Sequence, residues 1–298
     1  MTAFHAHGKI ILLGEHAVVY GHPALAGALS PGASARWTAG DEALTLHVSP
    51  WEARFVAGDD SDLGRALTVL GNHLGVTRGT LEATLHLPGG GGLGSSAALG
   101  VACIRALTGG ELSVDDTLAA ALVWERVFHG NPSGVDHTLA TRGGVGVYTQ
   151  AEGLRAVRSR VPVRVVLADT GERARTRDMV EMVARHRARQ PDGTERTLDA
   201  IGSLVRNAAL ALPVGDLKTL GDMMNLNQML LSSLLLSTER TEALCAAARA
   251  AGALGAKLTG AGGGGCVVAL TADPAAEARV VAAWRSLEAP AWAVTVGA

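Results

Sequence analysis

The sequence predicts a globular protein of mixed strand and helix, with strands concentrated in its first half and helices in its second. Of its 298 residues, 48% are hydrophobic and 18% are charged, a composition that supports a substantial packed core. The run 81–87 alternates apolar and polar residues as a strand does, whereas 62–74 repeats leucines at helical spacing. The change from strand-rich to helix-rich character near residues 150–175 marks the expected boundary between two parts.

Each element is expected from its own periodicity and end signals. In the first half, Ser113 and Asp116 give one helix a start that resembles a capping box. The second half is mostly helical. The expected strands are 9–13, 43–48, 81–87, 143–148, 163–169, 266–270 and 292–296, and the expected helices are 62–74, 113–128, 176–188, 195–211, 216–235, 239–251 and 274–287.

The charge and the cysteines narrow the class of protein. The formal net charge of −2 argues against general binding to nucleic acid or to a membrane surface. Cys103, Cys245 and Cys266 are widely spaced, so we expect buried, reduced thiols. The N-terminus lacks a long apolar region, and the Leu-rich run 223–238 is too short and polar to cross a membrane. We therefore expect a cytoplasmic protein with no nucleic-acid partner and no membrane partner.

The stretch PGGGGLGSSAALG, residues 88–100, is the strongest functional signal. Glycines lack Cβ atoms, so the backbone N–H groups can close around a small ligand. The helix that follows points its positive end into this loop. Together these features predict an anion site, and the usual anion is phosphate. The hydroxyls of Ser95 and Ser96 at the helix start can bind phosphate or Mg²⁺.

Two other interpretations of this loop stay open on the residues alone. One is a tight structural turn. The other is a dinucleotide fingerprint, because Gly89, Gly91 and Gly94 satisfy G-x-G-x-x-G. That fingerprint also needs an acidic residue about 20 positions later, and Glu111 follows a helix instead of a second strand. No G-x-x-x-x-G-K-[ST] motif occurs, so the loop is not a P-loop.

Glu125 is the most informative carboxylate. It falls in the same stripe of the helix 113–128 as Leu118, Ala121 and Leu122. A carboxylate on an apolar face is costly unless it is paired or bound to a metal. The residues alone leave two interpretations open, a structural ion pair, for example with a nearby arginine, and a Mg²⁺ ligand.

Three motifs, in the expected order, resemble those of the galactokinase, homoserine kinase, mevalonate kinase and phosphomevalonate kinase superfamily, the GHMP kinases. LPGGGGLGSSAA (87–98) resembles the ATP-binding motif, and KLTGAGGGGCVVAL (257–270) resembles the C-terminal glycine motif. KIILLGEHAVVYGHPALA (9–26) resembles the N-terminal motif in the form typical of mevalonate kinases. Galactokinases usually carry Asp-Tyr after Gly-Glu-His, where this chain has Ala17-Val18-Val19-Tyr20.

The resemblance implies an α+β fold in two domains. The N-terminal domain, 1–160, would be similar to ribosomal protein S5 domain 2 and would carry the ATP-binding glycine loop. The C-terminal domain, 161–298, would be ferredoxin-like with additional helices. Two departures from the family pattern stand out. His137 replaces the Asn that usually follows the catalytic Asp, and 232–244 lacks a Gly that is common in the Leu-rich stretch.

The resemblance also implies roles for individual residues. Asp136 would act at the attacking hydroxyl with Lys9 beside it, a pair that suits phosphoryl transfer because it accepts a proton and stabilises alkoxide. Mg²⁺ would bind Ser96 and Glu125, and the substrate would contact Glu15, His16 and Thr176. The residues implied to bind ATP are Pro88, Gly89, Gly90, Gly91, Gly92, Leu93, Gly94, Ser95, Ser96, Ala97, Gly260, Gly262 and Gly263.

The implied function is the ATP-dependent phosphorylation of (R)-mevalonate to 5-phosphomevalonate, a step of isoprenoid precursor biosynthesis. The implied ligands are ATP, Mg²⁺ and mevalonate, and a homodimer is possible by analogy with the family. The alternatives are a related kinase that acts on phosphomevalonate or a sugar, and a GHMP-fold ligand sensor without catalytic activity. A Rossmann oxidoreductase is the most distant alternative.

Overall fold

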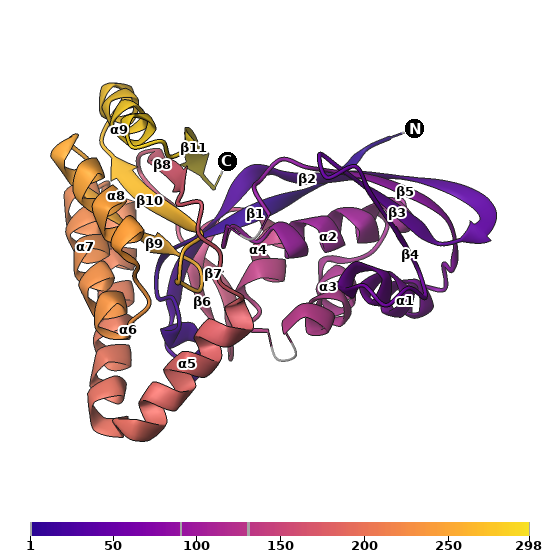
Figure 1. The fold of residues 1–298 in the computed structure, drawn as a ribbon, viewed down its shortest axis with the longest axis horizontal. Helices are drawn as coiled ribbons and strands as arrows, with labels where there is room; N and C mark the ends of the chain where they lie inside the picture. The colour runs from indigo at the N-terminus through magenta and orange to yellow at the C-terminus, as the bar shows by residue number, and fades with distance from the viewer. Residues whose placement is uncertain (1, 90, 130–131, 298) are drawn as a thin grey trace. The chain divides into compact units, whose positions relative to one another are not determined.

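The computed structural model describes residues 2–89, 91–129 and 132–297. The chain forms two compact units that interleave along the sequence (Figure 1). The first unit comprises 1–9, 30–89 and 94–143, and the second comprises 10–29, 90–93 and 144–298. The boundary expected at 160/161 stays a prediction, because each contact-based unit draws on several separate segments.

The first unit is a sheet with helices packed along one face. Its strands follow the order β4-β3-β5-β2, with β3 and β5 parallel and the other pairs antiparallel. Alternate residues of β5, among them Leu81 and Ala83, are buried against the helices, which lie on one side of the strands in Figure 1. The elements are β3 (Thr45–Ser49), β4 (Ala53–Val56), β5 (Arg78–Leu85), α1 (Asp62–Leu74), α2 (Ser95–Leu107), α3 (Val114–His129) and α4 (Val135–Arg142).

Two long strands pass through both units. They are β1 (Phe4–Leu13) and β2 (Ala24–Ala43). In the second unit, the first residues of β2 pair with β6 (Val145–Thr149), which pairs with β7 (Gly153–Ala156).

The second unit also contains a four-stranded antiparallel sheet of order β11-β8-β10-β9. Trp284 and Leu244 belong to a core cluster that includes Val166 and Val267 of this sheet. A separate cluster joins Leu258 to Leu198 and Leu231. The elements are η1 (Ala17–Tyr20), β8 (Val163–Asp169), β9 (Gly255–Thr259), β10 (Cys266–Thr271), β11 (Ala291–Val296), α5 (Thr176–Arg189), α6 (Pro191–Val214), α7 (Leu217–Ser233), α8 (Glu239–Ala250) and α9 (Pro274–Ser286).

Local signals predicted most elements well. The helix expected at 62–74 has those bounds, and Ser61 caps it by accepting from the Gly64 N–H group. Ser113 accepts from the Asp116 N–H group at 3.1 Å, which confirms the predicted start of α3. The strands β2, β4, β7 and β9 and the helix α4 were not predicted, since they are short or lack a clear alternation of apolar residues.

The three cysteines are buried and unbridged, as expected. Burial raises the pKa of the Cys103 thiol to about 12, so it is a neutral packing group. Within the described residues, no helix combines the length and apolar character needed to cross a bilayer.

Candidate active site

Lys9 and Asp136 form an ion pair in the first unit. Lys9 Nζ lies 3.3 Å from Asp136 Oδ1, and the two side chains are 4% and 30% exposed. Lys9 lies inside β1, which begins at Phe4, so the expected strand start at residue 9 was wrong. The ammonium group is therefore buried, with one partly exposed carboxylate beside it.

Asp136 is presented by the first turn of α4. Gly134 precedes this helix with φ 94°, a left-handed conformation that favours glycine. A helix start carries partial positive charge, so it stabilises the carboxylate of Asp136. The neighbouring His137 is buried, and burial lowers the pKa of its imidazole while the charge of Asp136 opposes that shift.

Ser96 and Glu125 come together where α2 begins. Ser96 Oγ donates to Glu125 Oε1 at 3.0 Å, and Trp124 Nε1 donates to the Ser96 carbonyl oxygen at 3.1 Å. The helices α2 and α3 are close here because Gly100 leaves room, since a Cβ atom at that position would lie 2.5 Å from Trp124 Cδ1. The start of α2 is thus fixed against α3 by two hydrogen bonds.

The Glu125 carboxyl group is only 1% exposed. Burial raises its pKa to about 8, the negative charge of Asp136 adds to the increase, and Ser96 and Lys9 oppose it. His129 Nε2 lies 3.7 Å from Glu125 Oε2, and no arginine pairs with Glu125 among the described residues. The interpretation of Glu125 as one half of an arginine ion pair is therefore not supported.

Gly94 joins the glycine loop to this cluster. It has φ 71° and precedes the first residue of α2. A Cβ atom at Gly94 would lie 2.7 Å from Lys9 Cγ, so only glycine lets the chain pass Lys9 this closely. Ser95 and Ser96 are partly exposed, whereas Ala97 is buried in the core of the first unit.

Within the second unit, the two glycine motifs pack backbone against backbone. Gly92 and Gly260 both have positive φ, and a Cβ atom on Gly260 would lie 2.8 Å from the Gly92 Cα atom. The Cys266 N–H group donates to the Gly91 carbonyl oxygen at 3.1 Å. Gly90 lies outside the described residues. Close packing therefore explains Gly92 and Gly260 independently of any ligand.

The other predicted loop residues have different surroundings. Leu93 is fully buried, and Pro88 and Gly89 are partly exposed beside the sheet of the first unit. A Cβ atom at Gly262 would lie 2.6 Å from the Leu236 carbonyl oxygen, and one at Gly263 would lie 2.8 Å from Ala174 Cβ. Both positions also have positive φ, so the turn 260–265 is closely packed as well.

Glu15 and His16 lie at the end of β1, in the second unit. Glu15 is 1% exposed and pairs with Lys257, which is 0% exposed. His16 Nε2 donates to the Ala261 carbonyl oxygen at 2.8 Å, because a carbonyl oxygen can only accept. Burial lowers the pKa of the His16 imidazole.

Sequence reasoning missed Lys257. Its signal was a lysine placed within the otherwise uncharged motif GAKLTGAGGGGC.

Thr176 is the first residue of α5 and is exposed. The residue before the helix is Arg175, and no side chain caps the helix start. Arg173 makes two hydrogen bonds to Asp169, at 2.7 and 2.6 Å.

Known proteins resemble this chain in both sequence and fold. The family described as GHMP kinases N terminal domain matches residues 62–144, and the family GHMP kinases C terminal matches 206–289. A mevalonate kinase of Aeropyrum pernix is 37% identical over 283 residues, covering 89% of this chain and 87% of that protein. A mevalonate kinase of Thermococcus gammatolerans is 35% identical over 305 residues, covering 91% and 90%. The chain belongs to the mevalonate kinase family of the GHMP kinases.

Solved structures confirm the fold of this GHMP kinase. The crystal structure of L. major mevalonate kinase in complex with R-mevalonate matches with a TM-score of 0.88 and 30% identity, covering 99% of this chain and 96% of that one. A galactokinase of Lactococcus lactis complexed with galactose shares the fold alone, with a TM-score of 0.79 and 19% identity. The expected α+β fold of two domains is confirmed, and the Rossmann interpretation of the glycine loop is wrong.

A kinase of this family uses ATP. Ser96 and Glu125 are the groups at the start of α2 that a magnesium ion would meet. No three His, Cys, Asp or Glu side chains converge as a metal site in the described part of the chain. Mg²⁺, however, binds through one or two carboxylates together with substrate phosphates and water. One hydroxyl and one buried carboxylate, whose anionic form is disfavoured without a cation, match that requirement.

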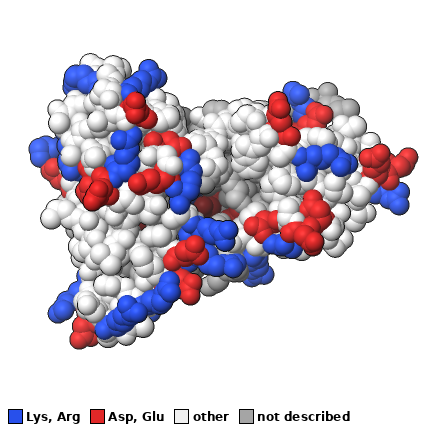
Figure 2. Space-filling view, viewed as in Figure 1, with Lys and Arg blue, Asp and Glu red and all other residues white. Residues whose placement is uncertain are grey.

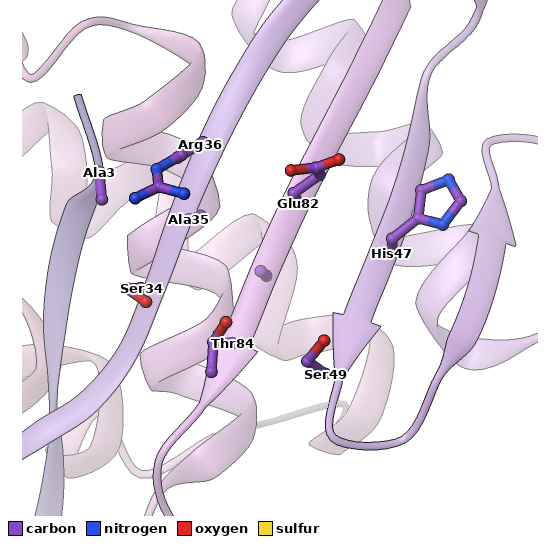
Figure 3. Close-up of a pocket in the computed structure, with 9 residues that line it drawn as sticks. Ala3, Ser34, Ala35, Arg36, His47, Ser49, Glu82 and Thr84 are labelled. Carbon is purple, nitrogen blue, oxygen red and sulfur yellow. The ribbon is translucent and has the colours of Figure 1, made fainter. Parts of the chain in front are cut away.

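A polar hollow lies elsewhere on the first unit, on the sheet face away from the helices (Figure 3). Its lining includes Arg36, Glu82 and His47, which are register partners on β2, β5 and β3. None of the predicted site residues of this GHMP kinase lines it.

Proposed function

We propose that this kinase transfers the γ-phosphoryl group of ATP to the 5-hydroxyl of (R)-mevalonate, giving 5-phosphomevalonate and ADP. Relatives named mevalonate kinase that cover most of the chain at 34–37% identity support this substrate. The observation that carries the chemistry is the Lys9–Asp136 ion pair, 3.3 Å long and in the same unit as the Ser96–Glu125 pair.

Lys9 and Asp136 act on the attacking hydroxyl. Asp136 accepts its proton, and the buried Lys9 ammonium stabilises the negative charge that develops on the oxygen. Phosphoryl transfer depends largely on positioning and charge neutralisation, so a fixed cation next to the acceptor is more important than a strong base.

The start of α2 and the glycine loop hold the triphosphate. No side chain caps α2, which begins at Ser95. The N–H groups of its first turn can therefore donate hydrogen bonds to a bound phosphate. The predicted contacts of Pro88–Ala97 and of Gly260, Gly262 and Gly263 with ATP belong to this proposal.

Ser96 and Glu125 would hold Mg²⁺, which would supply charge neutralisation to the triphosphate when bound.

His16 and Thr176 contact mevalonate in this proposal. The buried Nδ1 atom of His16 has no hydrogen-bond partner among the described residues, so it is available to a substrate group. Glu15 is already engaged with Lys257, and it therefore serves the substrate site through its neighbour His16.

An ADP-release assay tests the proposed function. The purified protein is supplied with ATP, Mg²⁺ and, in separate reactions, mevalonate, phosphomevalonate, galactose or homoserine. We expect turnover with mevalonate and far slower turnover with the other three. Turnover of another alcohol without mevalonate turnover would contradict the substrate but keep the kinase, whereas no turnover with any would favour a ligand sensor.

We further propose a cytoplasmic homodimer without nucleic-acid or membrane partners. Acidic and basic side chains are interspersed over the face shown in Figure 2, which suits a protein that does not bind polyanions. Leu210 and Val214 on α6 and Leu226 and Met229 on α7 are exposed apolar side chains suited to an interface. Sedimentation at twice the chain mass is expected, and a monomer at micromolar concentration would contradict the dimer.

A further inference from the structure

A buried ion pair in the second unit has no part in the phosphoryl-transfer chemistry. Lys257 Nζ donates to Glu15 Oε1 and, at 2.6 Å, to the Leu258 carbonyl oxygen. Asn227 Nδ2 lies 3.4 Å from the second carboxylate oxygen, Glu15 Oε2. Glu15, Lys257 and Asn227 are all buried, so the two charges are compensated by each other and by neighbouring amides.

A buried ion pair is by itself weak evidence of a contribution to stability. Removing two charges from water carries a large desolvation cost, and apolar residues of similar volume often stabilise a fold as well or better. Its position suggests a different explanation. Glu15 immediately precedes His16, and Lys257 lies four residues before Ala261, whose carbonyl oxygen accepts from His16 Nε2 at 2.8 Å. The turn that follows β1 is therefore held to the segment 257–261 by two consecutive side chains, Glu15 and His16.

His16 needs such fastening. Its φ of 59° places a residue other than glycine in the left-handed region, a strained conformation that persists only where the surrounding structure fixes it. Because Nε2 carries the proton that is donated to Ala261, Nδ1 of the neutral ring is an acceptor. That Nδ1 atom is buried and without a partner in the described part of the chain.

We propose that Lys257 is a positioning residue: through Glu15 it fixes the turn that holds His16 in the Nε2–H form and presents Nδ1 as an acceptor for a hydroxyl group of the substrate. This inference rests on the proposed contact of His16 with the substrate alcohol. It assigns to the substrate a hydrogen-bond donor at this point, because an acceptor such as a carboxylate oxygen would be repelled by the Nδ1 lone pair.

The double variant Glu15→Met, Lys257→Met tests the inference, since it removes both charges and leaves no buried charge without a partner. Expected results are an unfolding temperature close to that of the unmodified protein and a KM for mevalonate raised about tenfold, the scale of one lost hydrogen bond. The KM for ATP should stay within about twofold. Nitrogen-15 NMR of labelled histidines should show His16 as a mixture of tautomers, with its signal identified from a His16→Gln spectrum.

Thr271→Val is the matched control, because Thr271 is buried in the neighbouring strand β10 and its hydroxyl bonds to the Arg164 carbonyl oxygen, away from the pair. It should leave both KM values and the His16 signal unchanged.

If the double variant does not fold, Glu15→Asp tests the inference in its place. This variant keeps both charges and shortens the acidic side chain by one methylene. Glu15→Asp should raise the KM for mevalonate and broaden the His16 signal, whereas Thr271→Val should do neither. A folded double variant, or Glu15→Asp, with an unchanged mevalonate KM and an unchanged His16 tautomer would overturn the inference. Absence of mevalonate turnover in the unmodified protein would instead refute the proposed function, and the NMR comparison would still test the positioning role.

Discussion

Apart from His129, whose Nε2 lies 3.7 Å from Glu125 Oε2, the candidate active site offers one basic side chain to two carboxylates in the described part of the chain. Two carboxylates, Asp136 and Glu125, interact with one buried lysine, Lys9. Asp136 is in contact with the ammonium group and is partly exposed, whereas Glu125 is buried and bonded to the Ser96 hydroxyl. A proton on Glu125 or a further cation compensates the buried carboxylate, and a nucleotide-bound dication would meet that condition.

Replacing Glu125 with Gln tests this requirement. The unfolded chain releases the Glu125 proton near pH 4.5, whereas the folded, ligand-free protein holds it up to about pH 8. The folded state thus binds more protons in this window, and the free energy of unfolding falls as the pH rises through it. Glu125→Gln should flatten that part of the profile, as measured by thermal unfolding with nucleotide and Mg²⁺ absent.

The same group predicts proton release on ligand binding. At neutral pH, binding of Mg²⁺ and a non-hydrolysable ATP analogue should release about one proton from Glu125. Calorimetry in buffers of different ionisation enthalpy measures this number. Glu125→Gln should lose the proton release and need more Mg²⁺ for activity. An unchanged magnesium titration would return Glu125 to a purely structural role.

Asp136→Ala addresses the acceptor side of the reaction. It removes the proton acceptor and leaves the Lys9 ammonium buried without this partner. We expect kcat to fall by roughly a hundredfold or more, the usual scale for a general base, while ATP still binds. Steady-state kinetics and nucleotide titration separate the two effects. Turnover close to that of the unmodified protein would remove Asp136 from the mechanism.

At the scale of the elements, each glycine motif is fixed by what it packs against. Just before α2, Gly94 packs closely against the Lys9 side chain. In the second unit, the backbones of Gly92 and Gly260 are in close contact. Glycines that would be assigned to phosphate binding from sequence therefore also join strands and loops that lie far apart in the chain. Their loss should reduce stability even without ligand.

Gly92→Ala tests this structural role. A Cβ atom there would lie 2.7 Å from the Thr259 carbonyl oxygen, and φ is +76°. Gly153 has a φ of +73° with nothing within 4 Å of an added Cβ atom, which makes Gly153→Ala a matched control. The control should cost about 1–2 kcal/mol of unfolding free energy, and Gly92→Ala about 1–3 kcal/mol more from overpacking. Denaturant unfolding measures both, and equal losses would contradict the packing argument.

At the scale of the whole molecule, residues close in sequence were the predictable part. The strand, glycine loop and helix at 81–107 were apparent from local patterns, and motif order indicated the family. Burial and long-range pairing were not predictable in this way. Lys257 meets Glu15 across 242 positions, and the buried Lys9 pairs with Asp136 of α4. Such contacts depend on strand pairing between distant segments, which no local period encodes.

That dependence yields a prediction about the expected boundary at 160/161. A fragment of residues 161–298 retains β8–β11 and α5–α9 but loses residues 10–29 of the same compact unit. Ala17 would be missing from the cluster around Leu198, and Lys257 would lose Glu15 and the Ile11 carbonyl oxygen, the partners that residues 10–29 supply. We therefore expect the isolated fragment to give a poorly dispersed NMR spectrum and no cooperative unfolding. Adding Lys257→Met should restore part of the structure by removing the unpaired charge. A well-folded fragment with Lys257 intact would show instead that the boundary separates independent folding domains.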